Sequence, residues 1–114
     1  MYFLIFLQIK HWYIDFVLQT DAMVKGKGIY GNPQGIWHSA QHAIGTFLAA
    51  VFFTDLTVAT AVALFDFLTH YHIDWCKMKY GCRDITNPKF WNHLGLDQMA
   101  HQLIYIMIVW FTFA

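Results

Sequence analysis

Histidine and aspartate recur at a spacing of four residues within otherwise apolar stretches of this chain. Six pairs have this spacing, whereas seven His and seven Asp among 114 residues would give about 1.7 by chance. Four of these pairs lie in separate segments: His11/Asp15, His38/His42, His70/Asp74 and Asp97/His101. Because four residues make about one helical turn, each pair lies on one helix face. The pattern therefore favours helices that direct ligand-type side chains to a common interior.

The apolar stretches predict four helices, at about residues 2–19, 36–53, 56–77 and 88–113. Asp55 and Asn87 precede two of these stretches and suit the N-cap position, and Pro88 suits the first helical position. A glycine-rich connector with one short helical turn is expected near residues 20–35. Short connections make neighbouring helices antiparallel. We therefore expect one all-α domain, residues 1–114, folded as an up-down-up-down four-helix bundle.

The composition predicts that this bundle is integral to a membrane. Hydrophobic residues make up 58% of the chain and charged residues 12%, about half the charged share of a soluble domain. One end of each predicted helix is apolar on every side, most clearly in residues 103–114, and each helix is long enough to cross a bilayer. The net charge is zero and no basic stripe is present, which excludes a nucleic-acid partner. Membrane lipids are the expected partners, and association with further copies is left open.

In an antiparallel bundle all four His/Asp pairs lie at the same end. Six of the seven basic residues lie in the connections at that end: Lys25, Lys27, Lys77, Lys79, Arg83 and Lys89. The positive-inside rule then places this end in the cytoplasm and both termini in the periplasm of a bacterial inner membrane. Four tryptophans lie at the same level, either as interfacial anchors or as packing around the site: Trp12, Trp37, Trp75 and Trp91.

The eight paired side chains are the candidate metal ligands: His11, Asp15, His38, His42, His70, Asp74, Asp97 and His101. Imidazole and carboxylate groups suit zinc, manganese or iron, and eight of them exceed the needs of one ion, so two ions sharing a bridging Asp are expected. Such a centre hydrolyses esters. At a membrane surface the natural substrate is a lipid phosphate or another membrane-borne ester. The catalytic candidates are Asp15, Asp74, Asp97 and Lys77.

Several residues receive a supporting role. Lys77 either holds a phosphate or neutralises Asp74, and Gln19 continues the first stripe. Three further residues are expected to be supporting or interfacial rather than ligands: Asp66, His72 and His93. Cys76 and Cys82 are interpreted as free thiols.

Two other interpretations of the pairs stay open. The first is a metal-free network of His–Asp hydrogen bonds that fixes the register of the helices. The second is a path for protons or ions. The alternative function is then that of a non-enzymatic phage protein that binds or modulates a component of the host membrane, with a structural His/Asp cluster.

The motifs resemble those of a family of short phage and bacterial proteins that is known only as a domain of unknown function. The similar elements are HxxxDFxLQTD from His11 to Asp21, the His38/His42 pair, HxxxDxxK from His70 to Lys77, and DQxxH from Asp97 to His101. The resemblance implies a phage or prophage origin and a membrane location, but no activity. The layout is also similar to that of membrane-bound metal-dependent hydrolases, which is an analogy only.

Overall fold

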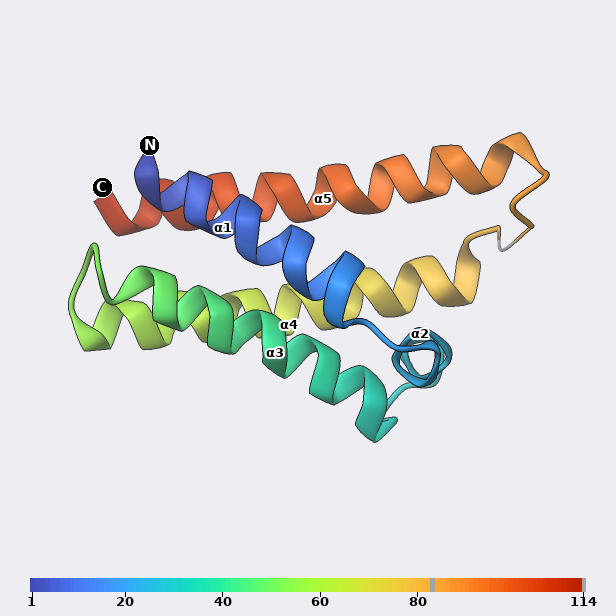
Figure 1. The fold of residues 1–114 in the computed structure, drawn as a ribbon, viewed down its shortest axis with the longest axis horizontal. Coiled ribbons are helices and arrows are strands. Elements are labelled where there is room, and N and C mark those ends of the chain that lie inside the picture. Colours follow the sequence, from blue (N-terminus) through green and yellow to red (C-terminus); the bar gives the residue numbers. More distant parts are fainter. Residues whose placement is uncertain (83, 114) are drawn as a thin grey trace.

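The computed structural model describes residues 1–82 and 84–113, and within them the regular structure is entirely helical (Figure 1). This confirms the predicted all-α class. The elements are α1 (Tyr2–Trp12), the π-helix η1 (Tyr13–Leu18), α2 (Asp21–Lys27), α3 (Pro33–Ala50), α4 (Leu56–Tyr80) and α5 (Pro88–Phe113). Arg83, counted above among the basic residues of the connections, lies outside the described residues, as does the last residue of the predicted domain.

Side-chain caps explain where these helices begin. Asp55 accepts a hydrogen bond from the backbone N–H of Val58 (2.8 Å), and Asn87 accepts one from that of Lys89 (2.9 Å). Asn32 caps α3 in the same way, so α3 starts at Pro33 and not near residue 36 as predicted. The short turn expected in the connector is the helix α2.

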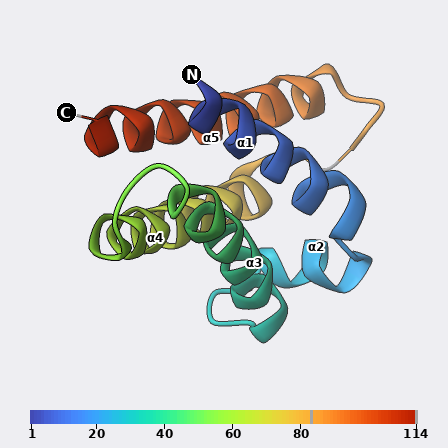
Figure 2. The same cartoon turned by 60° about the vertical axis from the view of Figure 1, so that its left-hand side comes forward.

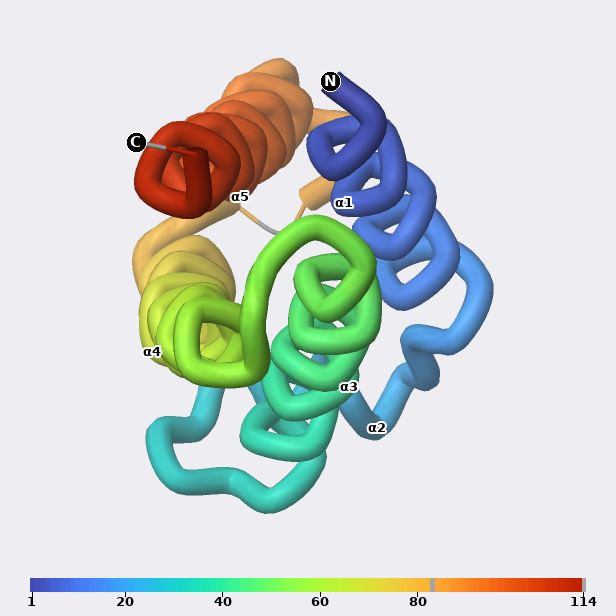
Figure 3. Tube along the Cα trace, turned by 90° about the vertical axis from the view of Figure 1, so that its left-hand side faces the viewer, coloured from blue at the N-terminus to red at the C-terminus, as the bar shows by residue number. Residues whose placement is uncertain are grey.

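The four long helical segments run in alternating directions along the longest axis of the molecule (Figure 1). α3 packs against α4, α4 against α5, and α1 against both α3 and α5, so that the four surround a common interior (Figure 3). Both termini lie at one end. At the other end the short α2 lies beside α3 (Figure 2) and contacts α3 and α4.

The interior has an apolar half and a polar half. The apolar half lies toward the termini and is formed by Phe3, Leu7, Ala50, Ala59, Val62, Tyr105 and Ile108. The polar half lies toward α2 and holds the buried His and Asp side chains. Burying polar groups costs free energy unless they form hydrogen bonds with one another or bind a ligand. The contacts of these side chains therefore indicate the role of the polar half.

Among the described helices, α4 is the one whose length and composition would allow it to cross a membrane. The core helix of a soluble protein meets the same criteria. The expectation that four helices span a bilayer is therefore not established by helix length and hydropathy.

Candidate metal centre

The structure brings the eight predicted site residues into one buried cluster. All eight side chains are at least nine-tenths buried: His11, Asp15, His38, His42, His70, Asp74, Asp97 and His101. Two come from each of four helical segments, as the spacing of four residues requires. η1 supplies Asp15 within a π-helical turn, a local widening that occurs frequently at functional sites.

Four of these residues form a first set of candidate ligands around the Asp15 carboxylate. Asp15 Oδ1 lies 2.7 Å from His42 Nε2, 3.0 Å from His38 Nε2 and 4.0 Å from His70 Nε2. One ligand atom from each of these residues lies within 4.8 Å of the others, so a single divalent ion could contact all four after small side-chain movements.

His70 also belongs to a second set, with Asp74 and His101. His70 Nε2 lies 3.1 Å from Asp74 Oδ2, and His101 Nε2 lies 3.1 Å from Asp74 Oδ1. The His70 ring stacks between the rings of His42 and His101, with centroid distances of 3.7 and 4.0 Å. The two sets therefore share one imidazole, whereas the sequence had suggested a shared aspartate.

Neither ring nitrogen of His70 makes a hydrogen bond to any described residue, although only 1% of the residue is exposed. Its Nε2 lies 3.1 Å from Asp74 Oδ2, an oxygen that Lys27 Nζ also approaches to 3.3 Å. Unsatisfied buried polar atoms are rare in native proteins because each costs free energy. A buried imidazole of this kind at the junction of the two sets is what a ligand site predicts.

His11 lies beside the first set and belongs to neither. Its Nδ1 accepts a hydrogen bond from the Tyr105 hydroxyl (2.8 Å), and its Nε2 donates to Gln98 Oε1 (2.7 Å). With both nitrogens engaged, His11 is placed to orient its neighbours, and Asp15 Oδ2 lies 3.2 Å from its Nε2. Its expected role as a ligand is thus not matched by this geometry.

Lys10 is a buried cation that the sequence interpretation left without a role in the site. Its ammonium donates to Asp66 Oδ2 (3.2 Å), to the Tyr105 hydroxyl (3.0 Å) and to His42 Nδ1 (3.2 Å). The lysine stem lies across α3 at Gly45, where an added Cβ would be 2.4 Å from Lys10 Cγ. Asp66, assigned above a supporting role, is the counter-ion of this lysine.

Two further lysines contact the second set. Lys27 of α2 is buried, with Nζ 3.3 Å from Asp74 Oδ2. Lys77 lies 3.9 Å from Asp97 Oδ2, and Asp97 Oδ1 lies 3.4 Å from His101 Nε2. The cation beside Asp74 is therefore Lys27 and not Lys77. Asp97 lies next to the second set without belonging to it.

The remaining predicted residues lie outside the cluster. The Gln19 side-chain amide donates a hydrogen bond to the backbone oxygen of Asp15 and not to the Asp15 carboxylate. His72 is exposed and bonds to Tyr30, and His93 accepts from the backbone N–H of Cys82 (2.7 Å). Three of the four tryptophans are half exposed or more, which favours surface anchoring over packing around the site: Trp12, Trp37 and Trp91. The two cysteines are free, as expected.

A search for other polar residue types at the same spacing of four residues would have identified more of the cluster. Asp66, four residues before His70, was already among the six pairs counted, whereas Thr46, which is buried, follows His42 by four residues. Tyr105 follows His101 in the same way. No local signal marks Lys27, because it enters from a different helix.

Comparison with curated proteins and with solved structures gives no match. A family model described as protein of unknown function (DUF3307) matches residues 3–114, nearly the whole chain and all eight residues of the cluster. The resemblance noted from the motifs is thereby confirmed at the level of an uncharacterised family. The chain belongs to the DUF3307 family of proteins of unknown function.

Proposed function

We propose that this protein is a membrane-bound, metal-dependent hydrolase whose His/Asp centre holds one or two divalent transition-metal ions. The observation that carries the proposal is the position of His70, a buried imidazole without a hydrogen bond that is common to two sets of candidate ligands. Zinc, manganese and iron suit these nitrogen and oxygen ligands.

The chemistry follows from the ligand types. A divalent ion held by these residues would polarise an oxygen of the scissile group and would activate the attacking water. Water adds to the phosphorus or carbonyl carbon, and the alcohol leaves with a proton. Asp15 and Asp74 would bind the ions, while Asp97 and Lys77 would contact the substrate side of the second set. A lipid phosphate or a membrane-borne ester is the proposed substrate.

Membrane insertion as an up-down-up-down four-helix bundle is part of the proposal. Large apolar side chains on every long helix are at least two-fifths exposed, which is unusual for a soluble monomer: Phe6, Ile9, Ile44, Leu48, Leu64, Leu68, Ile106 and Trp110. Lipid would cover them, while the basic connections near α2 would face the cytoplasm of a bacterial host. A reporter fused to the C-terminus should then be active only in the periplasm, and cytoplasmic activity would reverse the orientation.

Metal analysis of the detergent-purified protein is the primary test. We expect at least one equivalent of a transition metal, and removal of the metal by a chelator should abolish hydrolysis of a lipid phosphate. Asp15→Asn and Asp74→Asn should lose metal and activity while remaining folded, whereas Asp21→Asn, an exposed change on α2, should retain both. Metal-free protein with an unchanged fold and undiminished function would refute the proposal.

One observation favours the alternative of a structural cluster in a non-enzymatic phage protein. Lys10 and Lys27 compensate buried carboxylates within the protein itself. A protein of this second kind would keep its effect on the host membrane in both the Asp15→Asn and the Asp74→Asn variants, which separates the two functions.

A further inference from the structure

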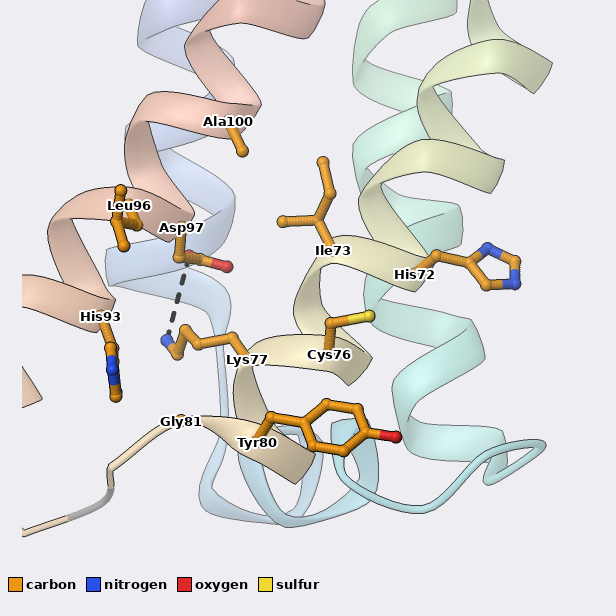
Figure 4. A pocket seen from close by; sticks show the side chains of 10 residues that line it. All are labelled: His72, Ile73, Cys76, Lys77, Tyr80, Gly81, His93, Leu96, Asp97 and Ala100. Carbon is orange, nitrogen blue, oxygen red and sulfur yellow. Dashed lines mark ion pairs between the residues drawn. The ribbon is translucent and has the colours of Figure 1, made fainter.

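A pocket of about 470 Å³ lies between the C-terminal part of α4 and the N-terminal part of α5 (Figure 4). It opens on the outer surface of the molecule, since Leu96 and Tyr80 on its walls are 51% and 71% exposed. Its size is that of a small-molecule site. A molecule could therefore enter it sideways, from the surroundings of the helices.

The walls change in polarity along the helix axes. Ile73 and Ala100 lie on one side of the Lys77–Asp97 ion pair, and Tyr80 and Gly81 lie on the other, toward the connection (Figure 4). The first side is the one that continues into the apolar stretches of α4 and α5. An amphiphile would thus place its polar head near Lys77 and its chain along Ile73 and Ala100.

The pocket is joined to the candidate metal centre by a single carboxylate. Asp97 lines the pocket and lies 3.9 Å from Lys77 Nζ through Oδ2, while its Oδ1 lies 3.4 Å from His101 Nε2. His101 belongs to the second ligand set. A head group held by Lys77 would consequently lie next to that set.

The charges of the site favour an anionic head group over a neutral ester. Four carboxylates and three ammonium groups lie in or next to the cluster among the described residues: Asp15, Asp66, Asp74, Asp97, Lys10, Lys27 and Lys77. With neutral imidazoles their sum is −1, so one divalent ion makes it +1 and two make it +3. Because uncompensated charge is costly away from water, the loaded site requires an anion such as a phosphate.

We propose that this pocket binds the phosphate head group of a lipid. The phosphate contacts Lys77, and the first part of the acyl chain packs against Ile73, Leu96 and Ala100. This proposal rests on the metal-loaded centre of the proposed function, because the positive charge that favours an anion comes from the bound ions.

Binding is tested on the detergent-purified full chain with zinc bound, and the mass of the bound lipid shows whether it is intact or hydrolysed. Native mass spectrometry would compare dioleoyl phosphatidic acid with dioleoylglycerol, which has the same chains and no phosphate. We expect phosphatidic acid to bind at least tenfold more tightly, because its phosphate forms a charge-assisted hydrogen bond with Lys77 that dioleoylglycerol cannot form. Inorganic phosphate that bound as tightly as phosphatidic acid would refute a lipid-specific site.

Two pairs of variants locate the binding site. Lys77→Gln should weaken phosphatidic acid binding about tenfold, while Lys79→Gln, an exposed change outside the pocket, should not. Leu96→Trp should fill the apolar side and weaken binding of both lipids, while Leu103→Trp should not, although Leu96 and Leu103 are equally exposed on α5. Unchanged binding in both Lys77→Gln and Leu96→Trp would overturn the pocket assignment.

The outcomes separate this proposal from the proposed function. A protein that binds phosphatidic acid through Lys77 and Leu96 yet hydrolyses no ester would overturn the proposed hydrolase function but not the assignment of the pocket. If wild type, Lys77→Gln and Leu96→Trp hydrolyse a lipid phosphate with the same KM, the assignment of the pocket is overturned but the proposed hydrolase function is not.

Discussion

Lys10 Nζ lies 3.2 Å from Asp66 Oδ2, with 8% of the lysine side chain and 1% of the aspartate side chain exposed. Removing one member of a buried ion pair leaves the other charge uncompensated. We expect Asp66→Asn to destabilise the protein by about 3–5 kcal/mol, and the double change Lys10→Met with Asp66→Leu to cost less than this. Unfolding followed by circular dichroism in detergent measures both. A loss in the double variant as large as that in Asp66→Asn, or larger, would contradict this expectation.

Lys27 and Asp74 give a prediction in which stability and metal binding move in opposite directions. Lys27→Met removes the ammonium 3.3 Å from Asp74 Oδ2, so the metal-free protein should become less stable. The same change removes a cation that opposes a divalent ion in the second set. Added zinc should therefore raise the midpoint of thermal unfolding more in Lys27→Met than in wild type.

Lys25→Met is the matched control for this experiment, because Lys25 is an exposed residue of the same short helix. It should change neither stability by more than about 0.5 kcal/mol nor the response to zinc. A smaller zinc response in Lys27→Met than in wild type would contradict a metal site at Asp74.

The contrast between Lys27 and the paired residues shows which parts of the site can be predicted from the sequence. A side chain at a spacing of four residues lies on the same helix face whatever the rest of the fold does, so His38/His42 could be placed from spacing alone. Lys27 reaches Asp74 because α2 packs closely on α3, where an added Cβ on Gly35 would lie 3.1 Å from the Gly26 carbonyl oxygen. That approach is a tertiary contact.

The π-helix is a second feature that periodicity could not identify. Over the six residues Tyr13–Leu18 the apolar pattern is compatible with either an α-helical or a π-helical turn. The consequence is local, because Asp15 still enters the cluster while Gln19 turns to the Asp15 backbone oxygen. The predicted extension of the stripe by Gln19 fails at this point.

Two helical glycines of different surroundings test the packing of the Lys10 stem. A Cβ on Gly45 would lie 2.4 Å from Lys10 Cγ, whereas a Cβ on Gly95 would have no side chain and no other element within 4 Å among the described residues. Gly45→Ala should therefore destabilise the protein by about 1–3 kcal/mol through overpacking. Gly95→Ala should be neutral or stabilise it by up to about 1 kcal/mol, because alanine favours a helix. Chemical unfolding of the two variants in the same detergent compares them directly, and equal effects would show that Lys10 does not lie against α3.

His70 and His72 lie two residues apart on α4 and test whether two ions share one ligand. His70 belongs to both candidate sets and is buried, whereas His72 is exposed and bonds to Tyr30. Because Nε2 has one lone pair, two ions would share His70 only as an imidazolate that uses both ring nitrogens; His70→Ala should then lower the stoichiometry at both sets, while Asp15→Asn should lower it only at the first and Asp74→Asn only at the second. Elemental analysis after removal of free metal gives these ratios.

His72→Ala should bind as much metal as wild type, since its ring lies outside both sets. Retention of full metal content by His70→Ala would mean that any bound ion is held elsewhere, and a loss in His72→Ala as large as that in His70→Ala would point to a general effect on α4.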